Sequence, residues 1–153
     1  MEPWKIVIGA DDAAYEYKER ILADLRADER VGEVIDLGVG ADEHTAYPHI
    51  GHDAATMVAN GEADRALLLC GTGMGMAIAA NKVPGVRAST AHDSFSVQRL
   101  VLSNDAQVLC LGQRVIGVEL ARTLVDEWLN YRFDPSSPSA EKVAAISSYE
   151  ESA

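Results

Sequence analysis

The chain has 153 residues and a formal net charge of −11, and 48% of its residues are hydrophobic. This length suits a single domain, residues 1–153, and the acidity argues against binding to nucleic acid or to an anionic membrane surface. No apolar run approaches the roughly 20 residues that span a bilayer. No signal-peptide pattern precedes the first strand-like segment, so we expect a cytoplasmic protein without membrane contact.

Short apolar runs alternate with longer amphipathic stretches, a pattern typical of strands that alternate with helices. The first half of the chain predicts a strand over residues 5–10, a helix over about 13–26, a strand over 33–37, a loop over 38–45 and a helix over 47–60. The last of these helices begins at Tyr47-Pro48, and proline is favoured in a first helical turn.

The second half continues the same alternation. It predicts a strand over 66–70, a glycine loop over 71–75 that opens a helix toward residue 81, a strand over 86–91, a helix capped by Ser94, a strand over 108–111, and helices over 117–131 and 139–150. Five strands with helical connections predict an α/β fold, in which a parallel sheet carries helices on both faces. Ligands of such sheets bind beyond the carboxyl ends of the strands.

The run Cys70-Gly71-Thr72-Gly73-Met74-Gly75 follows a buried strand directly and carries the strongest chemical signal. Its glycines let backbone N–H groups face a concavity, and the following helix adds the positive end of its dipole. Such a loop can hold an anion and favours the thiolate form of a cysteine at its edge. The spacing matches neither a P-loop nor a dinucleotide fingerprint. By itself it leaves a catalytic loop and a tight structural turn open, whereas Cys110 is interpreted as a small buried hydrophobe.

This run, continued by Ala79-Ala80-Asn81-Lys82-Val83-Pro84-Gly85-Val86-Arg87-Ala88, closely resembles the ribose-5-phosphate isomerase B / galactose-6-phosphate isomerase family. The likeness covers nearly the whole chain. It also includes Gly9-Ala10-Asp11, Tyr47-Pro48-His49, Ser103-Asn104-Asp105 and Gly112-Gln113-Arg114-Val115-Ile116-Gly117.

The resemblance implies a Rossmann-like αβα sandwich that isomerises a small phosphorylated sugar. It implies a homodimer or a dimer of dimers with a shared active site, in which the helix over 139–150 packs on a partner subunit. It implies neither a metal nor an organic cofactor. The residues agree with this, since none of the four histidines has a metal-ligand spacing with a cysteine.

The resemblance also implies roles for individual residues. Cys70 would be the base that moves the proton, Thr72 would contact substrate hydroxyls and Asp11 would hydrogen-bond the sugar. The enediolate would be held by the amides of Gly71, Gly73 and Gly75 with Asn104 nearby. Separately from the resemblance, Met74 and Met76 are expected to line the pocket only as packing residues.

Three departures from the family pattern concern the substrate. The sequence has Asp12 where the family usually has a phosphate-binding histidine, and Ser103 where it usually has a ring-opening histidine. Near the last helix Lys142 replaces two arginines, although Arg114 is retained as a cation for the phosphate. His92 could replace the ring-opening acid, or it could form only a local hydrogen bond.

One substrate would account for these changes together. A tetrose 4-phosphate cannot close a furanose ring because its O4 is esterified, so it needs no ring-opening acid. We therefore expect an aldose–ketose isomerase of erythrulose 4-phosphate, with ribose 5-phosphate as the alternative substrate. Two readings from other classes are a non-catalytic partner subunit and a flavodoxin-like binding module. The retention of Cys70 and Thr72 argues against the first.

Overall fold

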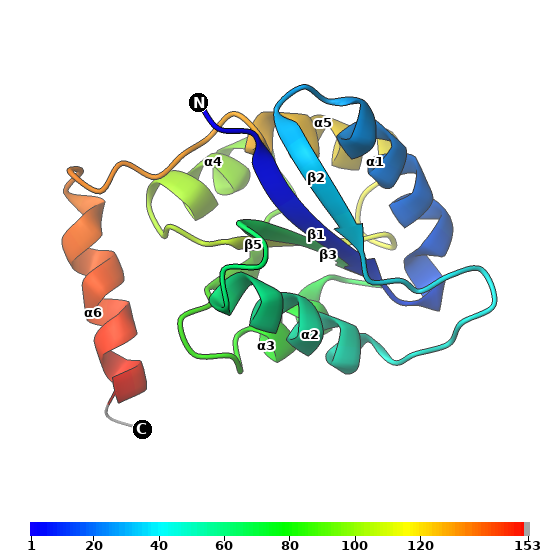
Figure 1. Cartoon of the computed structure of the whole chain (residues 1–153), viewed down its shortest axis with the longest axis horizontal. Coiled ribbons are helices and arrows are strands. Elements are labelled where there is room, and N and C mark those ends of the chain that lie inside the picture. The colour runs from blue at the N-terminus through cyan, green and yellow to red at the C-terminus, as the bar shows by residue number, and fades with distance from the viewer. Residues whose placement is uncertain (152–153) are drawn as a thin grey trace.

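The computed structural model describes residues 1–151, which form a three-layer αβα sandwich with one helix standing away from it (Figure 1). The elements in chain order are β1 (Trp4–Ala10), the 3-10 turn η1 (Asp12–Ala14), α1 (Tyr15–Ala27), β2 (Val31–Asp36), α2 (Tyr47–Ala59), β3 (Arg65–Cys70), α3 (Met74–Ala80), β4 (Ala88–Thr90), α4 (Ser94–Leu102), β5 (Val108–Gly112), α5 (Val118–Trp128) and α6 (Ser139–Glu151). The expected α/β fold with a five-stranded parallel sheet is confirmed.

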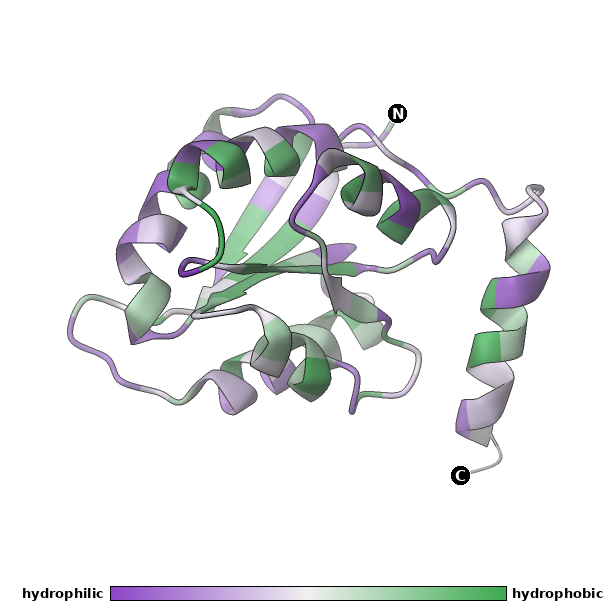
Figure 2. Cartoon of the chain, turned by 180° about the vertical axis from the view of Figure 1, so that it is seen from behind, coloured by the Kyte–Doolittle hydropathy of each residue, from purple (hydrophilic) through white to green (hydrophobic). Residues whose placement is uncertain are grey.

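The sheet has the strand order β2-β1-β3-β5-β4, and every pair of neighbouring strands is parallel. Its register aligns Ile8 with Leu67 and Leu67 with Leu109. Because side chains alternate across a strand, this row lies on one face and the residues between its members lie on the other. Figure 2 shows the central strands mostly in hydrophobic colours, as expected for a sheet covered on both faces.

The hydrophobic core consists of two clusters, one on each face of the sheet. One joins Ile8, Leu67 and Leu109 to α1, α4 and α5, and the other joins Leu68, Cys70 and Cys110 to α2 and α3. Cys70 therefore belongs to the face that α2 and α3 cover. This places its sulfur beside the glycine loop that leads from β3 into α3.

Several element boundaries differ from the predicted ones, among them three in the second half of the chain. β4 spans only Ala88–Thr90, because Val86 closes a turn by donating its N–H to the Val83 carbonyl. The cap of α4 is Asp93, whose carboxylate accepts the Ser96 N–H at 2.8 Å, so the assignment of Ser94 as the cap was wrong. α5 begins after Gly117 and ends at Trp128, three residues earlier than expected.

The last helix, α6, stands apart from the sandwich in Figures 1 and 2. It touches the body where the Gly85 N–H donates to the Glu150 carboxylate at 2.9 Å, and Val143 is its buried apolar residue. Ile146 on the same helix is 46% exposed. Within residues 1–151, no helix is both long and apolar enough to cross a membrane.

Candidate active site

A cavity of about 280 Å³ opens at the carboxyl end of β3. Its walls come from the end of β1, the start of α2, the glycine loop and the turn after β5. The lining residues are Asp11, Ala13, Tyr47, Cys70, Gly71, Thr72, Gly75 and Arg114. The structure thus brings together Asp11, Arg114 and most of the glycine loop, which lie far apart in the sequence.

Two glycines allow the loop to pack against the end of β5. Gly73 has a φ of +80°, a left-handed conformation that side chains with a Cβ rarely adopt, and a Cβ there would lie 3.0 Å from Leu111 and Thr90. A Cβ on Gly112 would lie 2.5 Å from the carbonyl carbon of Thr72. The loop is further tied to the following turn, since the Arg114 N–H donates to the Gly71 carbonyl at 2.9 Å.

Cys70 lies at the wall of this cavity with 4% of its surface exposed. Its Sγ accepts the backbone N–H of Gly73 at 3.2 Å, a contact of the kind that stabilises a sulfur anion. The Gly73 amide was expected to hold the enediolate, but the structure directs it to the sulfur instead. The Met74 N–H is likewise taken by the Thr72 hydroxyl oxygen, at 3.3 Å.

Asp11 offers an unused hydrogen-bond acceptor to the cavity. Its Oδ1 is buried and has no partner among residues 1–151, and burial, followed by the neighbouring Asp12 carboxylate, raises the pKa of Asp11. A buried polar atom without a partner is costly, so a ligand hydroxyl that donates to it would be favoured.

Arg114 places a cation beside the same space. Its side chain lies over Gly71, whose added Cβ would be 3.8 Å from the Arg114 Nε. In the described part of the chain, its guanidinium has no hydrogen bond or ion pair with another side chain. A planar guanidinium with free donors suits a phosphate or a developing oxyanion.

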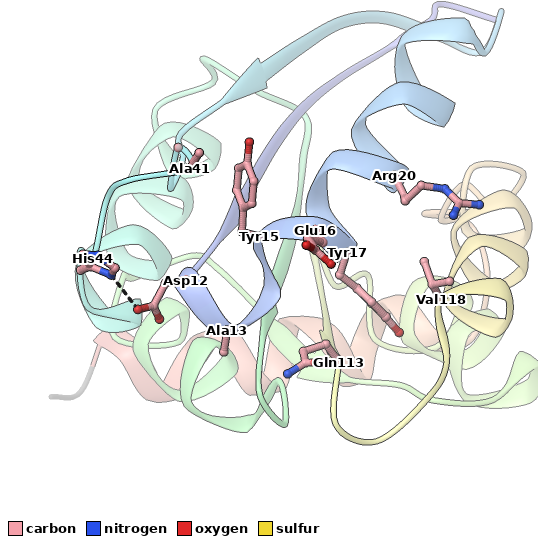
Figure 3. A pocket seen from close by; sticks show the side chains of 11 residues that line it. Asp12, Ala13, Tyr15, Glu16, Tyr17, Arg20, Ala41, His44, Gln113 and Val118 are labelled. Atoms are coloured by element: carbon pink, nitrogen blue, oxygen red, sulfur yellow. Dashed lines mark hydrogen bonds and ion pairs between the residues drawn. The ribbon is translucent and has the colours of Figure 1, made fainter.

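Asp12 lines a different cavity, of about 710 Å³, between the start of α1 and the loop after β2 (Figure 3). Its Oδ2 lies 2.9 Å from the Nδ1 of His44, and this hydrogen bond lowers the pKa of Asp12. The side chain points toward His44 (Figure 3), and Asp12 is not among the residues that line the Cys70 cavity. Asp12 was expected to bind substrate, and in this structure it does not face the Cys70 cavity.

His92 forms a local hydrogen bond, which was one of the two roles expected for it. Its Nε2 accepts the Gly112 N–H at 2.9 Å, and burial lowers its pKa. A neutral ring whose Nε2 accepts a backbone N–H carries its proton on Nδ1, so Nε2 itself has no proton to give. His92 does not line the Cys70 cavity, so a single chain does not bring it to Cys70.

Four other residues expected to bind substrate lie away from the Cys70 cavity. Ser103 and Asn104 follow α4 near the amino end of β5, where the Asn104 carbonyl accepts from Arg87, whereas Cys70 is at the carboxyl end of β3. Lys142 is on α6, outside the sandwich. Met74 is 57% exposed at the start of α3 and does not line the cavity. A single chain therefore does not bring these four side chains to Cys70.

Two residues of the site region were not named as site residues in the sequence analysis. Tyr47 lines the Cys70 cavity at the start of α2, and its Tyr-Pro helix start could have indicated a position at the same sheet edge. His44 lies in a loop without periodicity, so no local pattern indicated its contact with Asp12. Among residues 1–151, no three His, Cys, Asp or Glu side chains are grouped to hold a metal ion.

The fold and the cavity define an α/β enzyme whose site combines a thiol, a carboxylate and an unpaired guanidinium. The family model described as Ribose/Galactose Isomerase matches residues 6–146, and the chain belongs to that family. A relative from Mycolicibacterium smegmatis, D-erythrulose-4-phosphate isomerase 2, is 63% identical over 147 residues, which are 95% of this chain and 97% of the relative.

Other relatives extend the comparison. Ribose-5-phosphate isomerase B of Escherichia coli is 42% identical over 147 residues, covering 96% of this chain and 97% of the relative. The solved structure of Clostridium thermocellum ribose-5-phosphate isomerase B matches with a TM-score of 0.90 and 41% identity, covering 97% of this chain and 98% of that one. The expected family and the expected sandwich are both confirmed by these matches.

Proposed function

We propose that this chain interconverts D-erythrulose 4-phosphate and the corresponding aldose phosphate, with Cys70 as the proton-transferring base. The observation that carries the chemistry is the Cys70 sulfur at the wall of a cavity that also holds Asp11 and the unpaired Arg114. The substrate is supported by two relatives named as D-erythrulose-4-phosphate isomerases, at 63% and 43% identity.

The proposed step conserves all atoms of the sugar. The Cys70 thiolate takes a proton from C1 of the ketose, and the electrons of that C–H bond form the C1=C2 bond of an enediolate. Negative charge develops on O2, where the loop amides of Gly71 and Gly75 would stabilise it, leaving Arg114 for the phosphate. The O1 proton moves to O2, the thiol returns its proton to C2, and O1 becomes the aldehyde oxygen.

A four-carbon substrate fits the presence of Ser103 where the family usually has a ring-opening histidine. A pentose 5-phosphate aldose closes a furanose ring and must be opened before isomerisation, whereas a tetrose esterified at O4 stays open. The imidazole nearest in sequence to the glycine loop, His92, is engaged with the Gly112 N–H. Ribose 5-phosphate is the second candidate, since relatives from Listeria innocua and Escherichia coli at 44% and 42% identity are named ribose-5-phosphate isomerases.

We also propose that two copies of the chain share their sites. Ser103, Asn104 and Lys142 lie away from the Cys70 of their own chain, and α6 carries the exposed Ile146 beyond the sandwich. A second copy could receive these residues. The two free cysteines support a reducing compartment, so the cytoplasm is the proposed location.

Solvent exchange tests the proposed base. The wild-type protein in deuterated water is expected to exchange the hydrogen on the carbon next to the carbonyl of erythrulose 4-phosphate. Cys70→Ala should lose this exchange by roughly 10²–10⁴-fold, the usual contribution of one acid–base group. Cys110→Ala removes the other thiol and is expected to retain it. Near wild-type exchange in Cys70→Ala would disprove the role of Cys70, and no exchange in the wild type would favour a non-catalytic partner subunit.

A further inference from the structure

Asp11 and Asp12 are consecutive in sequence, yet they line two different cavities. Asp11 belongs to the Cys70 cavity of about 280 Å³, and Asp12 belongs to the neighbouring cavity of about 710 Å³. Ala13 lines both, so the two spaces adjoin at this residue. The Cys70 cavity is slightly smaller than the range of about 300–1,000 Å³ that small-molecule sites occupy. A ligand that outgrows it has the Asp12 cavity next to it.

The Asp12 cavity is lined by acidic side chains. Asp12 and Glu16 both line it, and Figure 3 shows their side chains with those of Arg20 and His44 around the same space. The charge of Arg20 is offset by Glu119, whose Oε1 is 3.2 Å away. The two carboxylates also stand at the start of α1, where they already occupy the positive end of the helix.

His44 fixes the orientation of the Asp12 carboxylate. Its Nδ1 lies 2.9 Å from Oδ2, and this hydrogen bond lowers the pKa of Asp12. Without this partner, the exposed Asp12 side chain could rotate into solvent. His44 is therefore a positioning residue for the charge on Asp12.

We propose that Asp12, held by His44, selects substrates by chain length. This inference rests on the proposed function. A short ketose phosphate with its reactive end at Cys70 keeps its phosphate near Arg114, within the first cavity. A chain longer by one carbon, anchored at the same sulfur, carries its phosphate past Ala13 toward Asp12 and Glu16. Repulsion between the phosphate dianion and the fixed carboxylate then disfavours the longer substrate.

Two open-chain ketoses provide the test: erythrulose 4-phosphate and ribulose 5-phosphate. Neither can close a furanose ring onto its C2 carbonyl, because O5 is esterified in ribulose 5-phosphate and erythrulose 4-phosphate has no O5. The two ketoses therefore differ in chain length without a ring-opening step. The measured quantity is the ratio of kcat/KM for the five-carbon ketose to that for the four-carbon ketose. Asp12→Asn removes one charge and keeps the shape of the side chain.

Asp12→Asn is expected to raise this ratio about five- to tenfold, the effect of one unit charge a few ångströms away in a solvated site. His44→Ala should raise it by less, because the charge remains but is no longer fixed. Glu62→Gln is the matched control, since it removes one exposed carboxylate at the opposite end of the sheet, and it should leave the ratio unchanged. Added salt should raise the wild-type ratio, because it screens the repulsion.

An unchanged ratio in Asp12→Asn would overturn the inference. An equal loss with both ketoses would also overturn it, because Asp12 would then be a general substrate ligand. Either result is independent of the proposed function, which wild-type turnover of the four-carbon ketose tests by itself. Thermal denaturation of each variant verifies that it is folded.

Discussion

Cys70 and Cys110 lie on neighbouring strands and on the same face of the sheet, but their surroundings give them different chemistry. Cys110 is fully buried among apolar side chains, and this burial raises the pKa of its thiol well above the ordinary value. Cys70 is two residues further toward the carboxyl end in register, where the strand meets a cavity and an N–H donor. Reactivity at this site is therefore a matter of position along a strand.

Protonation of the single residue His92 also predicts how the stability of the fold depends on pH. The folded state favours neutral His92, because burial lowers its pKa below the ordinary 6.5 and because Nε2 accepts from Gly112. The unfolded chain takes up the proton first as pH falls, so the His92 contribution to stability is present above 6.5 and is lost as pH falls through the folded-state pKa.

Replacing His92 by Gln should therefore reduce the fall in unfolding free energy between about pH 7.5 and about pH 5.5. Urea denaturation at a series of pH values measures this, with His52→Gln, an exposed histidine on α2, as the control. If His92→Gln and the wild type lose stability in parallel over this range, the hydrogen bond to Gly112 does not govern the titration.

At the scale of elements, the connection from β3 to α3 depends on one left-handed residue. Gly73 combines a positive φ with close approach to β5, and its N–H is the donor to Cys70. Gly85 has a similar φ of +87° but nothing within 4 Å of its added Cβ. A side chain at Gly85 would therefore meet only backbone strain, whereas a side chain at Gly73 would meet backbone strain and steric crowding.

Gly85→Ala should cost about 1–2 kcal/mol of unfolding free energy from backbone strain, with little effect on turnover. Gly73→Ala adds crowding, which usually costs about 1–3 kcal/mol more, and it should also abolish most turnover because the loop must move away from the sulfur. Denaturation and steady-state rates measure the two effects. Equal turnover in both variants would contradict the role given to the Gly73 amide.

The same elements explain how far the sequence could be interpreted. Apolar runs predicted all five strands, and parallel strands end at one edge, where ligands bind. The structure brings Asp11, after β1, and Cys70, at the end of β3, to one cavity at that edge, whereas Asp12 and His92 do not line it. The contact between Asp12 and His44 joins residues that are 32 positions apart in the sequence. His44 lies in a loop without hydrophobic periodicity, so no sequence pattern indicates this contact. Lys18, buried against Asp36 at 3.0 Å, was equally invisible, since its helix carries many exposed charges.

At the scale of the whole molecule, α6 is an arm with few ties to the rest of its own chain. Just before it, Arg132 stacks on the Trp4 ring and donates to the Glu2 carbonyl, so the chain is fixed to the sandwich before the arm begins. Arg132 lies near Lys142 in the sequence, but its guanidinium is engaged at the amino edge of the sheet. An arm attached in this way suits contact with another copy.

Removal of residues 139–153 should therefore leave a folded sandwich but weaken self-association. Light scattering coupled to size exclusion would measure the mass, and thermal denaturation would verify a cooperative transition. Turnover of erythrulose 4-phosphate should fall with the mass, because the proposed sites are shared. A truncated chain that keeps the oligomeric state and the turnover of the full chain would contradict both the role of α6 in self-association and the sharing of sites between copies.

The stacking around Arg65 has a consequence for spectroscopy. This guanidinium lies 3.8 Å from the ring centroid of Trp4 and 5.2 Å from that of Trp128, the two tryptophans of the chain. Both indoles thus lie near the amino ends of the strands, whereas Cys70 lies at the carboxyl end of β3. Their emission will report loosening of the arm's anchor and global unfolding, but a sugar entering the catalytic mouth will leave it unchanged.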